Sequence, residues 1–333
     1  MRAWELRPPF GIDGLTPVDR PERTPGHGQV TVRVRAVSLN HRDLSTVQNA
    51  AQRQLRPGLV PCSDGAGEVV AVGEGVTRVK VGDRVAGIFM QTWLAGEMTP
   101  AHQRSALGGA IDGMLAQQVV LHEDGLVHVP PHLSYEEASC LPCAGVTAWQ
   151  ALVTRGGIKA GDTILTQGTG GVSIFALQFG RMHGTRVLST SSSDQKLARL
   201  HEMGANEGIN YKTGPEWGKR AREMTGGAGV DHVVEVAGTL GQSVEAARIG
   251  GTVSIIGAVG GREAVNSGTV LSKQLRLQGI YVGSREMFEA MNRAITVHST
   301  HPVIDRVFPF AETREAFRHM ESGAHFGKIV ISV

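Results

Sequence analysis

The sequence has few cysteines, and their number excludes a disulfide-stabilised architecture. Only Cys62, Cys140 and Cys143 occur in 333 residues, and an odd count of three fits a protein of a reducing compartment. Cys140 and Cys143 stand in a Cys-x-x-Cys spacing, which is typical of metal clamps and of redox pairs. Because Pro142 separates the two before a glycine turn, a redox pair is the weaker interpretation. We expect Cys140 to be a small buried hydrophobic residue.

An excess of charge of one sign is also missing, as are long apolar runs. The 33 basic and 31 acidic residues almost balance, and no basic run interleaved with aromatic residues indicates a nucleic-acid surface. No stretch reaches the roughly 18 apolar residues of a membrane-spanning helix, and the first residues, MRAWELRPPFGIDGL, do not resemble a signal peptide. We expect a soluble, cytoplasmic protein with a small-molecule substrate and no membrane or nucleic-acid partner.

The chain is rich in glycine and long enough for two domains. Its 44 glycines exceed the roughly 7 % of average proteins, and 333 residues exceed the size at which one core usually keeps growing. Up to about Glu123, short β-rich runs alternate with glycine and proline; Gln29–Val37 places Val30, Val32 and Val34 on one face. This rhythm predicts an antiparallel barrel or sandwich.

From about Gly161 the rhythm becomes strand, glycine turn and helix, repeated. A helix is predicted at Ile174–Met182 and another from about Asp194 to Met203, and strands are predicted at Asp162–Gln167, Arg186–Ser191, Gly229–Gly238, Gly251–Gly260 and Leu275–Gly283. Nearly continuous apolar strands that alternate with helices are typical of a parallel sheet covered on both faces.

The turn after the first of these strands has the pattern of a dinucleotide site. Gly168, Gly170, Gly171, Val172 and Ser173 stand between a strand and a helix, where backbone N–H groups approach a pyrophosphate. A plain tight turn is the alternative, but the strands that follow favour a dinucleotide.

The end of the second of these strands, Arg186–Ser191, indicates whether NADP(H) or NAD(H) is bound. This strand ends in Ser191 and Ser192 where NAD sites place an acid, and Lys196 lies one helical turn on, so we favour NADP(H) over NAD(H). Asp194 argues the other way, although it also suits a helix cap.

Several motifs, in order, give a family resemblance. SLNHRDL (38–44), SDGAGEVVAVGEGV (63–76), CAGVTAW (143–149) and SGAHFGKIVI (322–331) make the chain resemble the medium-chain dehydrogenase/reductase superfamily, and within it the zinc-free quinone oxidoreductase and enoyl reductase branch. The resemblance implies an α/β fold with a GroES-like, β-rich catalytic domain at 1–124, completed by 284–333. It also implies a Rossmann-type doubly wound parallel sheet domain at 125–283, a substrate cleft at the junction, and a homodimer.

The resemblance also allows the metal question to be asked residue by residue. Zinc-dependent relatives carry a Cys where this chain has Asn40, a His where it has Ser63, and a third ligand at Cys143. An asparagine amide and a serine hydroxyl are poor substitutes for thiolate and imidazole, so we predict an enzyme without zinc. Asn40 becomes the first candidate for stabilising an oxyanion. His41, Asp43, Ser45 and Ser63 are weaker candidates, and for Asp43 a helix cap is the stronger interpretation.

Further cofactor contacts follow from the resemblance alone. They are Thr147 beside the nicotinamide, Tyr211 at the 2′-phosphate, and Gly238, Ile256, Gly257 and Gly283 along the cofactor path. Phe89, Met90 and Trp93 suit either an apolar substrate wall or ordinary core packing.

The predicted function is an NAD(P)H-dependent oxidoreductase, with NADPH favoured, that reduces a quinone or an α,β-unsaturated carbonyl double bond without zinc. A zinc-free alcohol dehydrogenase or carbonyl reductase is the enzymatic alternative. A non-catalytic NADPH-binding protein is the second class, motivated by the lack of an obvious acid–base pair near Asn40.

Overall fold

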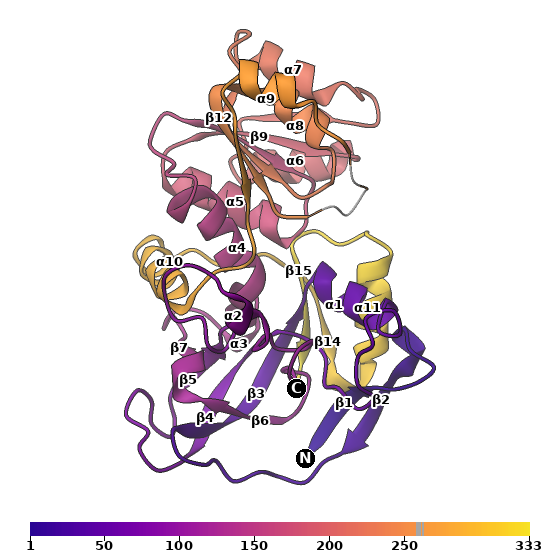
Figure 1. The fold of residues 1–333 in the computed structure, drawn as a ribbon, viewed down its shortest axis with the longest axis vertical. Coiled ribbons are helices and arrows are strands. Elements are labelled where there is room, and N and C mark those ends of the chain that lie inside the picture. Colours follow the sequence, from indigo (N-terminus) through magenta and orange to yellow (C-terminus); the bar gives the residue numbers. More distant parts are fainter. Residues whose placement is uncertain (258–260, 262) are drawn as a thin grey trace. The chain divides into compact units, whose positions relative to one another are not determined.

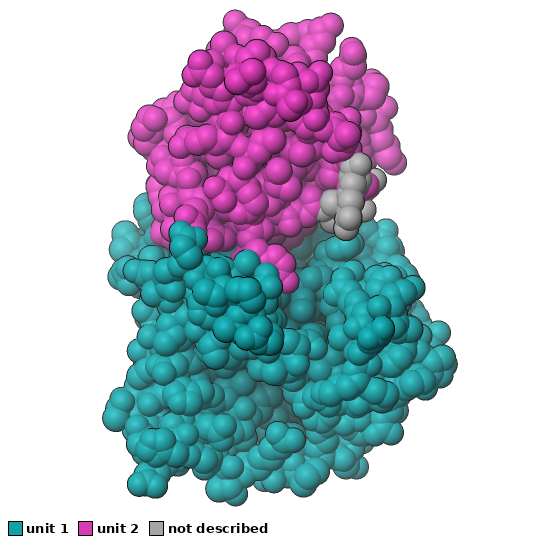
Figure 2. All heavy atoms as spheres, in the orientation of Figure 1, with its two compact units in different colours: residues 1–146, 282–333 teal, residues 147–281 magenta. Residues whose placement is uncertain are grey.

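The computed structural model describes residues 1–257, 261 and 263–333 (Figure 1). The chain divides into two compact units, 1–146 with 282–333, and 147–281, which Figure 2 distinguishes by colour. The fold class is α/β, as predicted.

The first unit is built mainly from antiparallel strands. A seven-stranded sheet has the order β14-β15-β3-β4-β5-β7, with β6 also paired to β3, and β1 pairs with β2 in a separate two-stranded sheet. The bounds are β1 (Arg2–Leu6), β2 (Leu15–Asp19), β3 (Gln29–Leu39), β4 (Asp64–Val72), β5 (Arg84–Gly87), β6 (Gln118–His122), β7 (Leu126–His128), β14 (Ile304–Pro309) and β15 (Lys328–Ser332). Its helices are α1 (His41–Gln48), α2 (Pro100–Gln103), α3 (Tyr135–Ser139), α10 (Arg285–His298) and α11 (Thr313–Glu321).

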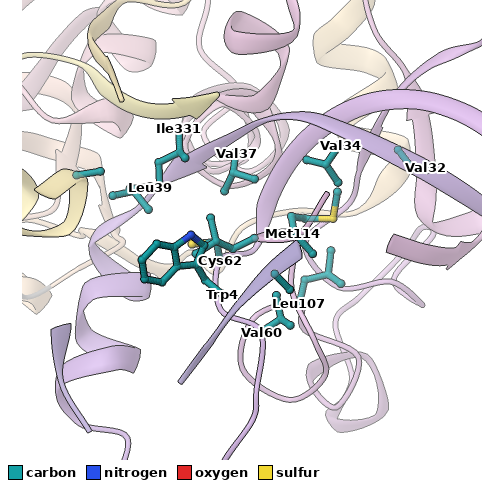
Figure 3. Close-up of a cluster of buried hydrophobic side chains, with 14 of the residues drawn as sticks. Trp4, Val32, Val34, Val37, Leu39, Val60, Cys62, Leu107, Met114 and Ile331 are labelled. Atoms are coloured by element: carbon teal, nitrogen blue, oxygen red, sulfur yellow. The ribbon is translucent and has the colours of Figure 1, made fainter. Parts of the chain in front are cut away.

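The core of this unit forms around β3. Val30, Val32 and Val34 are buried on one face as the alternation predicts, and Arg33 on the other face is exposed. Figure 3 shows Val32, Val34, Val37 and Leu39 with Ile331 of β15 and, from the amino-terminal end, Trp4. The two ends of the chain therefore contribute to one core.

The register between β15 and β3 matters for the site. The strands are antiparallel, and Ile329 lies opposite Leu39. In the same register, Lys328 lies opposite Asn40, the residue that follows β3. Residues almost the whole chain apart are thus brought together by sheet pairing.

The second unit contains a six-stranded parallel sheet in the order β10-β9-β8-β11-β12-β13. In chain order this is 3-2-1-4-5-6, the doubly wound arrangement of dinucleotide-binding domains. The bounds are β8 (Thr163–Gln167), β9 (Arg186–Ser191), β10 (Glu207–Asn210), β11 (Val230–Glu235), β12 (Ala247–Ile255), β13 (Arg276–Gly279), α5 (Gly171–Met182), α6 (Asp194–Glu202), α7 (Trp217–Met224), α8 (Leu240–Ala246) and α9 (Ser267–Ser272). The short helix α4 (Val146–Trp149) begins at the division between the units.

Several boundaries differ from those predicted. The first unit extends to Val146 rather than 124, because β7 pairs with β5 and keeps the following segment with the first sheet. Helix α5 begins at Gly171, earlier than Ile174, since glycine at its start is already helical. The last three residues of the strand predicted at Gly251–Gly260 lie outside the described residues, and β12 itself ends at Ile255. Among the described residues, no helix is long and apolar enough to cross a membrane.

Candidate functional site

Asn40 lies between β3 and α1, where the end of a strand meets the start of a helix. Its backbone N–H donates to Asp43 Oδ2 at 2.9 Å, so Asp43 satisfies the backbone at the start of α1. Asn40 and Asp43 form the capping box of α1, and the Asn40 side chain makes a further contact. Its Oδ1 accepts a hydrogen bond of 2.6 Å from the Lys328 ammonium, which also donates to the carbonyl oxygen of Leu39 at 2.6 Å.

This bond fixes how the Asn40 amide is oriented. Asn40 is 8 % exposed and Lys328 is 3 % exposed, so both groups are held away from bulk water. With Oδ1 facing a cation, Nδ2 must point elsewhere, and it has no hydrogen-bond partner of normal geometry among the described residues. A buried N–H without a partner is costly, which makes Nδ2 a donor ready for a ligand.

Asp64, the first residue of β4, holds two further candidates together. Its Oδ1 accepts from the Ser63 hydroxyl at 2.6 Å, and its Oδ2 accepts from the backbone N–H of Cys143 at 2.9 Å. Burial raises the pKa of the Asp64 carboxyl to about 6, although the Lys328 ammonium and the Asn40 amide act in the opposite direction. Asn40, Ser63 and Cys143, which the sequence suggested separately, are therefore gathered around one carboxylate and one ammonium.

The hydrogen bonds of Asp43 indicate a structural role. Its carboxylate is fully buried and accepts from the backbone N–H groups of Asn40 and of Ser63, the latter at 3.3 Å, and from the Arg42 guanidinium at 3.1 Å. Both oxygens are thereby occupied. The cap alternative for Asp43 fits this geometry, and its effect on the site is to position Asn40 and Ser63.

The two cysteines of the Cys-x-x-Cys spacing are unlike each other. Cys140 is buried, and its thiol lies 3.3 Å from the carbonyl oxygen of Glu136, with its pKa raised to about 12 by burial. Cys143 as a whole is partly exposed, but its thiol is surrounded by protein atoms, and this desolvation, together with the nearby Asp64 carboxylate, raises the pKa of the thiol. Both cysteines are free thiols. A raised pKa disfavours the thiolate that redox exchange and metal binding require.

The donor set is a poor match for zinc. The Asn40 oxygen is bound to an ammonium, and the Ser63 hydroxyl donates to a carboxylate. A divalent cation beside Asn40 Oδ1 would be repelled by Lys328, and of the side chains at positions 40, 63 and 143 only Cys143 is a usual zinc ligand. Within the part of the chain that the structure describes, no three His, Cys, Asp or Glu side chains form a group suited to a metal ion.

The glycine turn of the second unit fits a pyrophosphate. Gly168 has φ +70°, and a Cβ on it or on Gly170 would meet no atom within 4 Å, so the space beside the turn is open. Gly170 is the N-cap of α5, and no side chain in the described residues caps this helix. The N–H groups of Gly171 and Val172, at the start of the helix, are therefore available to an anion.

The end of β9 brings the second group of cofactor candidates together. Ser191 is buried, its hydroxyl accepts from the N–H of Ser193 at 3.3 Å, and its carbonyl oxygen accepts from the N–H of Tyr211 at 3.1 Å. Ser193 caps α6 through the N–H of Lys196. Ser192 and Lys196 are half-buried and Tyr211 is exposed. Ser192 follows β9 and Tyr211 follows β10, so both lie at the carboxyl ends of neighbouring parallel strands, and Lys196 lies in the first turn of α6.

The remaining candidates divide between the units. Gly238 and Gly257 follow β11 and β12 at the carboxyl ends of the parallel strands, with Ile256 between β12 and Gly257, and Thr147 is buried in α4. Gly283 belongs to the first unit, and a Cβ there would lie 2.3 Å from Val146, so packing alone requires glycine at this position. Phe89, Met90 and Trp93 are almost fully buried, as core residues are, whereas His41 is exposed.

Sequence reasoning missed Asp64 and Lys328. A lysine at the start of the apolar strand KIVIS was the available signal, because lysine is almost never fully buried without a partner. No comparable signal pointed to Asp64 beyond its place next to Ser63.

A doubly wound sheet with an open glycine turn, joined to a β-rich unit with a buried polar cluster, defines a two-unit dehydrogenase or reductase. Two family models match the chain, an alcohol dehydrogenase GroES-like domain at residues 26–131 and a zinc-binding dehydrogenase at residues 171–296. The chain belongs to the medium-chain dehydrogenase/reductase superfamily and is an oxidoreductase.

Its relatives carry more than one kind of name. It is 41 % identical to a zinc-type alcohol dehydrogenase-like protein of Schizosaccharomyces pombe, over 97 % of this chain and 96 % of the relative. It is 30 % identical to a chloroplastic quinone oxidoreductase of Triphysaria versicolor, over 96 % and 94 %. A crystal structure described as an NAD-dependent alcohol dehydrogenase superposes with a TM-score of 0.91 at 34 % identity, covering all of both chains.

Proposed function

We propose that this protein is an NADPH-dependent, zinc-independent oxidoreductase that reduces a quinone or an α,β-unsaturated carbonyl double bond. The observation that carries the proposal is the buried Asn40 amide, whose oxygen is held by Lys328 and whose Nδ2, on the side of Asp64, forms no hydrogen bond of normal geometry among the described residues. When bound, the reduced nicotinamide would supply the hydride. The glycine turn and the uncapped start of α5 would hold its pyrophosphate.

The residues of the first unit would act on the substrate oxygen. Asn40 Nδ2 would donate a hydrogen bond to the carbonyl oxygen as negative charge develops there. Lys328 would keep the amide from rotating, and its positive charge would add favourable potential at the same place. Asp64 and Ser63 would keep the walls of the site ordered through their mutual hydrogen bond, and water would supply the proton.

The preference for NADPH rests on the end of β9. Ser191 and Ser192 place hydroxyls where a carboxylate would repel a 2′-phosphate, and Lys196 lies in the first turn of α6. Asp194 is engaged elsewhere, because its Oδ1 accepts from the Asn210 side-chain amide at 2.7 Å. The structural relative described as NAD-dependent supports the opposite choice, so both dinucleotides belong in the assay.

A substrate panel tests the reaction class. Oxidation of NADPH and of NADH would be followed at 340 nm against quinones, enones, aldehydes and ketones. Turnover of quinones or enones supports the proposal. Turnover restricted to aldehydes and ketones would refute it and establish a zinc-free alcohol dehydrogenase or carbonyl reductase, which the names of the relatives also support. Tight dinucleotide binding without turnover of any class would indicate a non-catalytic binding protein.

A further inference from the structure

Glu235, the last residue of β11, has a buried carboxylate that binds the loop following its own strand. Glu235 is only 1 % exposed. Its Oε1 accepts three backbone N–H groups, from Ala237 at 2.9 Å, Gly238 at 2.7 Å and Thr239 at 3.3 Å. One oxygen therefore fixes three consecutive peptides, and these lead directly into α8.

Gln167 completes the arrangement from the neighbouring strand. Strands β8 and β11 are parallel, with Thr166 opposite Val234, so Gln167 and Glu235 are neighbours at the carboxyl ends. Gln167 Nε2 donates to Glu235 Oε2 at 2.8 Å, and Gln167 Oε1 accepts from the N–H groups of Val236 and Ala237, each at 3.1 Å. The hydroxyl of Ser243 in α8 also donates to Glu235 Oε2 and receives a bond from Gln167 Nε2.

Gln167 also reaches the glycine turn. It immediately precedes Gly168, and its carbonyl oxygen accepts from the hydroxyl of Ser173, in the first turn of α5, at 2.6 Å. The side chains of Glu235 and Gln167 thus bind the loop at 236–239, and the main chain of Gln167 leads directly into the turn at 168–171. In open α/β sheets, ligands bind outside the carboxyl ends of the strands, where these two segments lie.

Moving a carboxylate from water into the protein interior costs free energy unless it gains hydrogen-bond partners. The partners of Glu235 therefore indicate which part of the structure the carboxylate holds in place. In the described residues, the partners of Glu235 are backbone amides, an amide side chain and a hydroxyl, none of which is a cation. The charge is therefore stabilised by hydrogen bonds that hold the loop in one conformation. An apolar residue would fill the space but leave the loop N–H groups without acceptors.

We propose that Glu235 and Gln167 are a positioning pair for the dinucleotide, acting through the backbone of the loop at 236–239. The proposal rests on the dinucleotide binding proposed above and adds the residues that shape the site without touching its ligand. Its consequence is that affinity for the dinucleotide depends on the hydrogen-bond pattern of the pair more than on which of the two residues carries the charge.

Exchange of the two residues tests this directly. Glu235→Gln places an NH₂ group against either the loop N–H groups or Gln167 Nε2, and we expect the Kd for NADPH to rise by about tenfold or more. The double variant Gln167→Glu with Glu235→Gln keeps every bond available. In it the carboxylate at position 167 accepts from the amide at position 235, and the Ser243 hydroxyl can turn to donate to that carboxylate. We expect its Kd to return to within about threefold of the wild-type value.

Binding would be measured by titration calorimetry and by NADPH fluorescence, with folding checked by circular dichroism. Glu245→Gln is the matched control, since Glu245 lies on α8 as Ser243 does, is half-exposed and pairs with Arg222; its Kd should not change. Should Glu235→Gln fail to fold, Ser243→Ala removes only one hydroxyl and should still weaken binding by a few-fold.

The outcomes separate this inference from the proposed function. A folded Glu235→Gln protein with a wild-type Kd, or a double variant as weak as the single, would overturn the positioning pair while dinucleotide binding stands. Ser243→Ala without effect would overturn it when the single variant does not fold. A wild-type protein that binds neither NADPH nor NADH would refute the proposed function, and the pair would fall with it.

Discussion

The oxygen and the NH₂ group of the Asn40 side chain have different roles in the proposed site, and a mutation can separate them. Lys328 binds Oδ1, whereas Nδ2 is the proposed donor to the substrate. Asn40→Asp keeps an oxygen for Lys328 and removes the NH₂ group, so the fold should be retained. We expect kcat to fall by about 100-fold, the usual effect of removing one donor from an oxyanion site. Steady-state kinetics with the best substrate of the panel, together with the Kd for NADPH, checks this.

Asn49→Asp provides the control, because it introduces the same change at the C-cap of the same helix. It should leave kcat unaltered. If Asn40→Asp retained full activity, the amide would have no part in stabilising the substrate oxygen.

The raised pKa of Asp64 predicts that the free energy of unfolding falls as the pH rises. Its carboxyl pKa is about 6 in the folded protein and about 3.9 in an unfolded chain, so the folded state binds the proton more tightly. The stability that this proton contributes is full below about pH 4 and is lost as the pH rises through 6. Relative to Asp64→Asn, the wild-type protein should therefore lose up to about 3 kcal/mol of unfolding free energy between pH 4 and pH 7.

Urea denaturation of both proteins across this range measures the difference, and other titrating groups cancel in the comparison. A difference that stays constant with pH would mean that the folded protein does not raise the pKa of Asp64.

At the scale of elements, the segment that joins β9 to α6 decides between the two dinucleotides. Ser192 stands between the buried Ser191 and the cap Ser193, so it is the position where a new side chain disturbs least. Ser192→Asp should weaken NADPH binding by about tenfold or more through repulsion of the 2′-phosphate, and should leave or improve NADH binding. The ratio of the two Kd values is the measurement.

Ser272→Asp, at the exposed end of α9, adds the same charge to the same unit and should not change the ratio. An unchanged ratio in Ser192→Asp would show that the proposed 2′-phosphate site lies elsewhere.

The elements themselves were largely predictable, because their signals are local. Alternating residues located β3, and the glycine turn located β8 and, to within three residues, the start of α5. The partners of Asn40 were not predictable in this way. Lys328 reaches Asn40 only through the register of β15 on β3, and Asp64 reaches Cys143 across another long separation in sequence. Proximity of that kind depends on tertiary pairing, which no spacing within a motif reveals.

For the whole molecule, the deciding question is whether an enzyme of this superfamily works here without metal. Both ends of the chain build the first unit, and Lys328, from the carboxyl-terminal strand, supplies a fixed positive charge beside Asn40. That ammonium would repel a divalent ion at this position, and the raised pKa of Cys143 disfavours the remaining thiolate ligand.

We therefore expect purified protein to contain far less than one zinc per chain by plasma mass spectrometry. Prolonged dialysis against EDTA should leave its turnover and melting temperature unchanged, and added zinc should not increase either. The untreated protein dialysed in parallel is the control for losses during handling. Stoichiometric zinc that leaves together with activity would contradict this prediction and show that the enzyme depends on a bound metal ion.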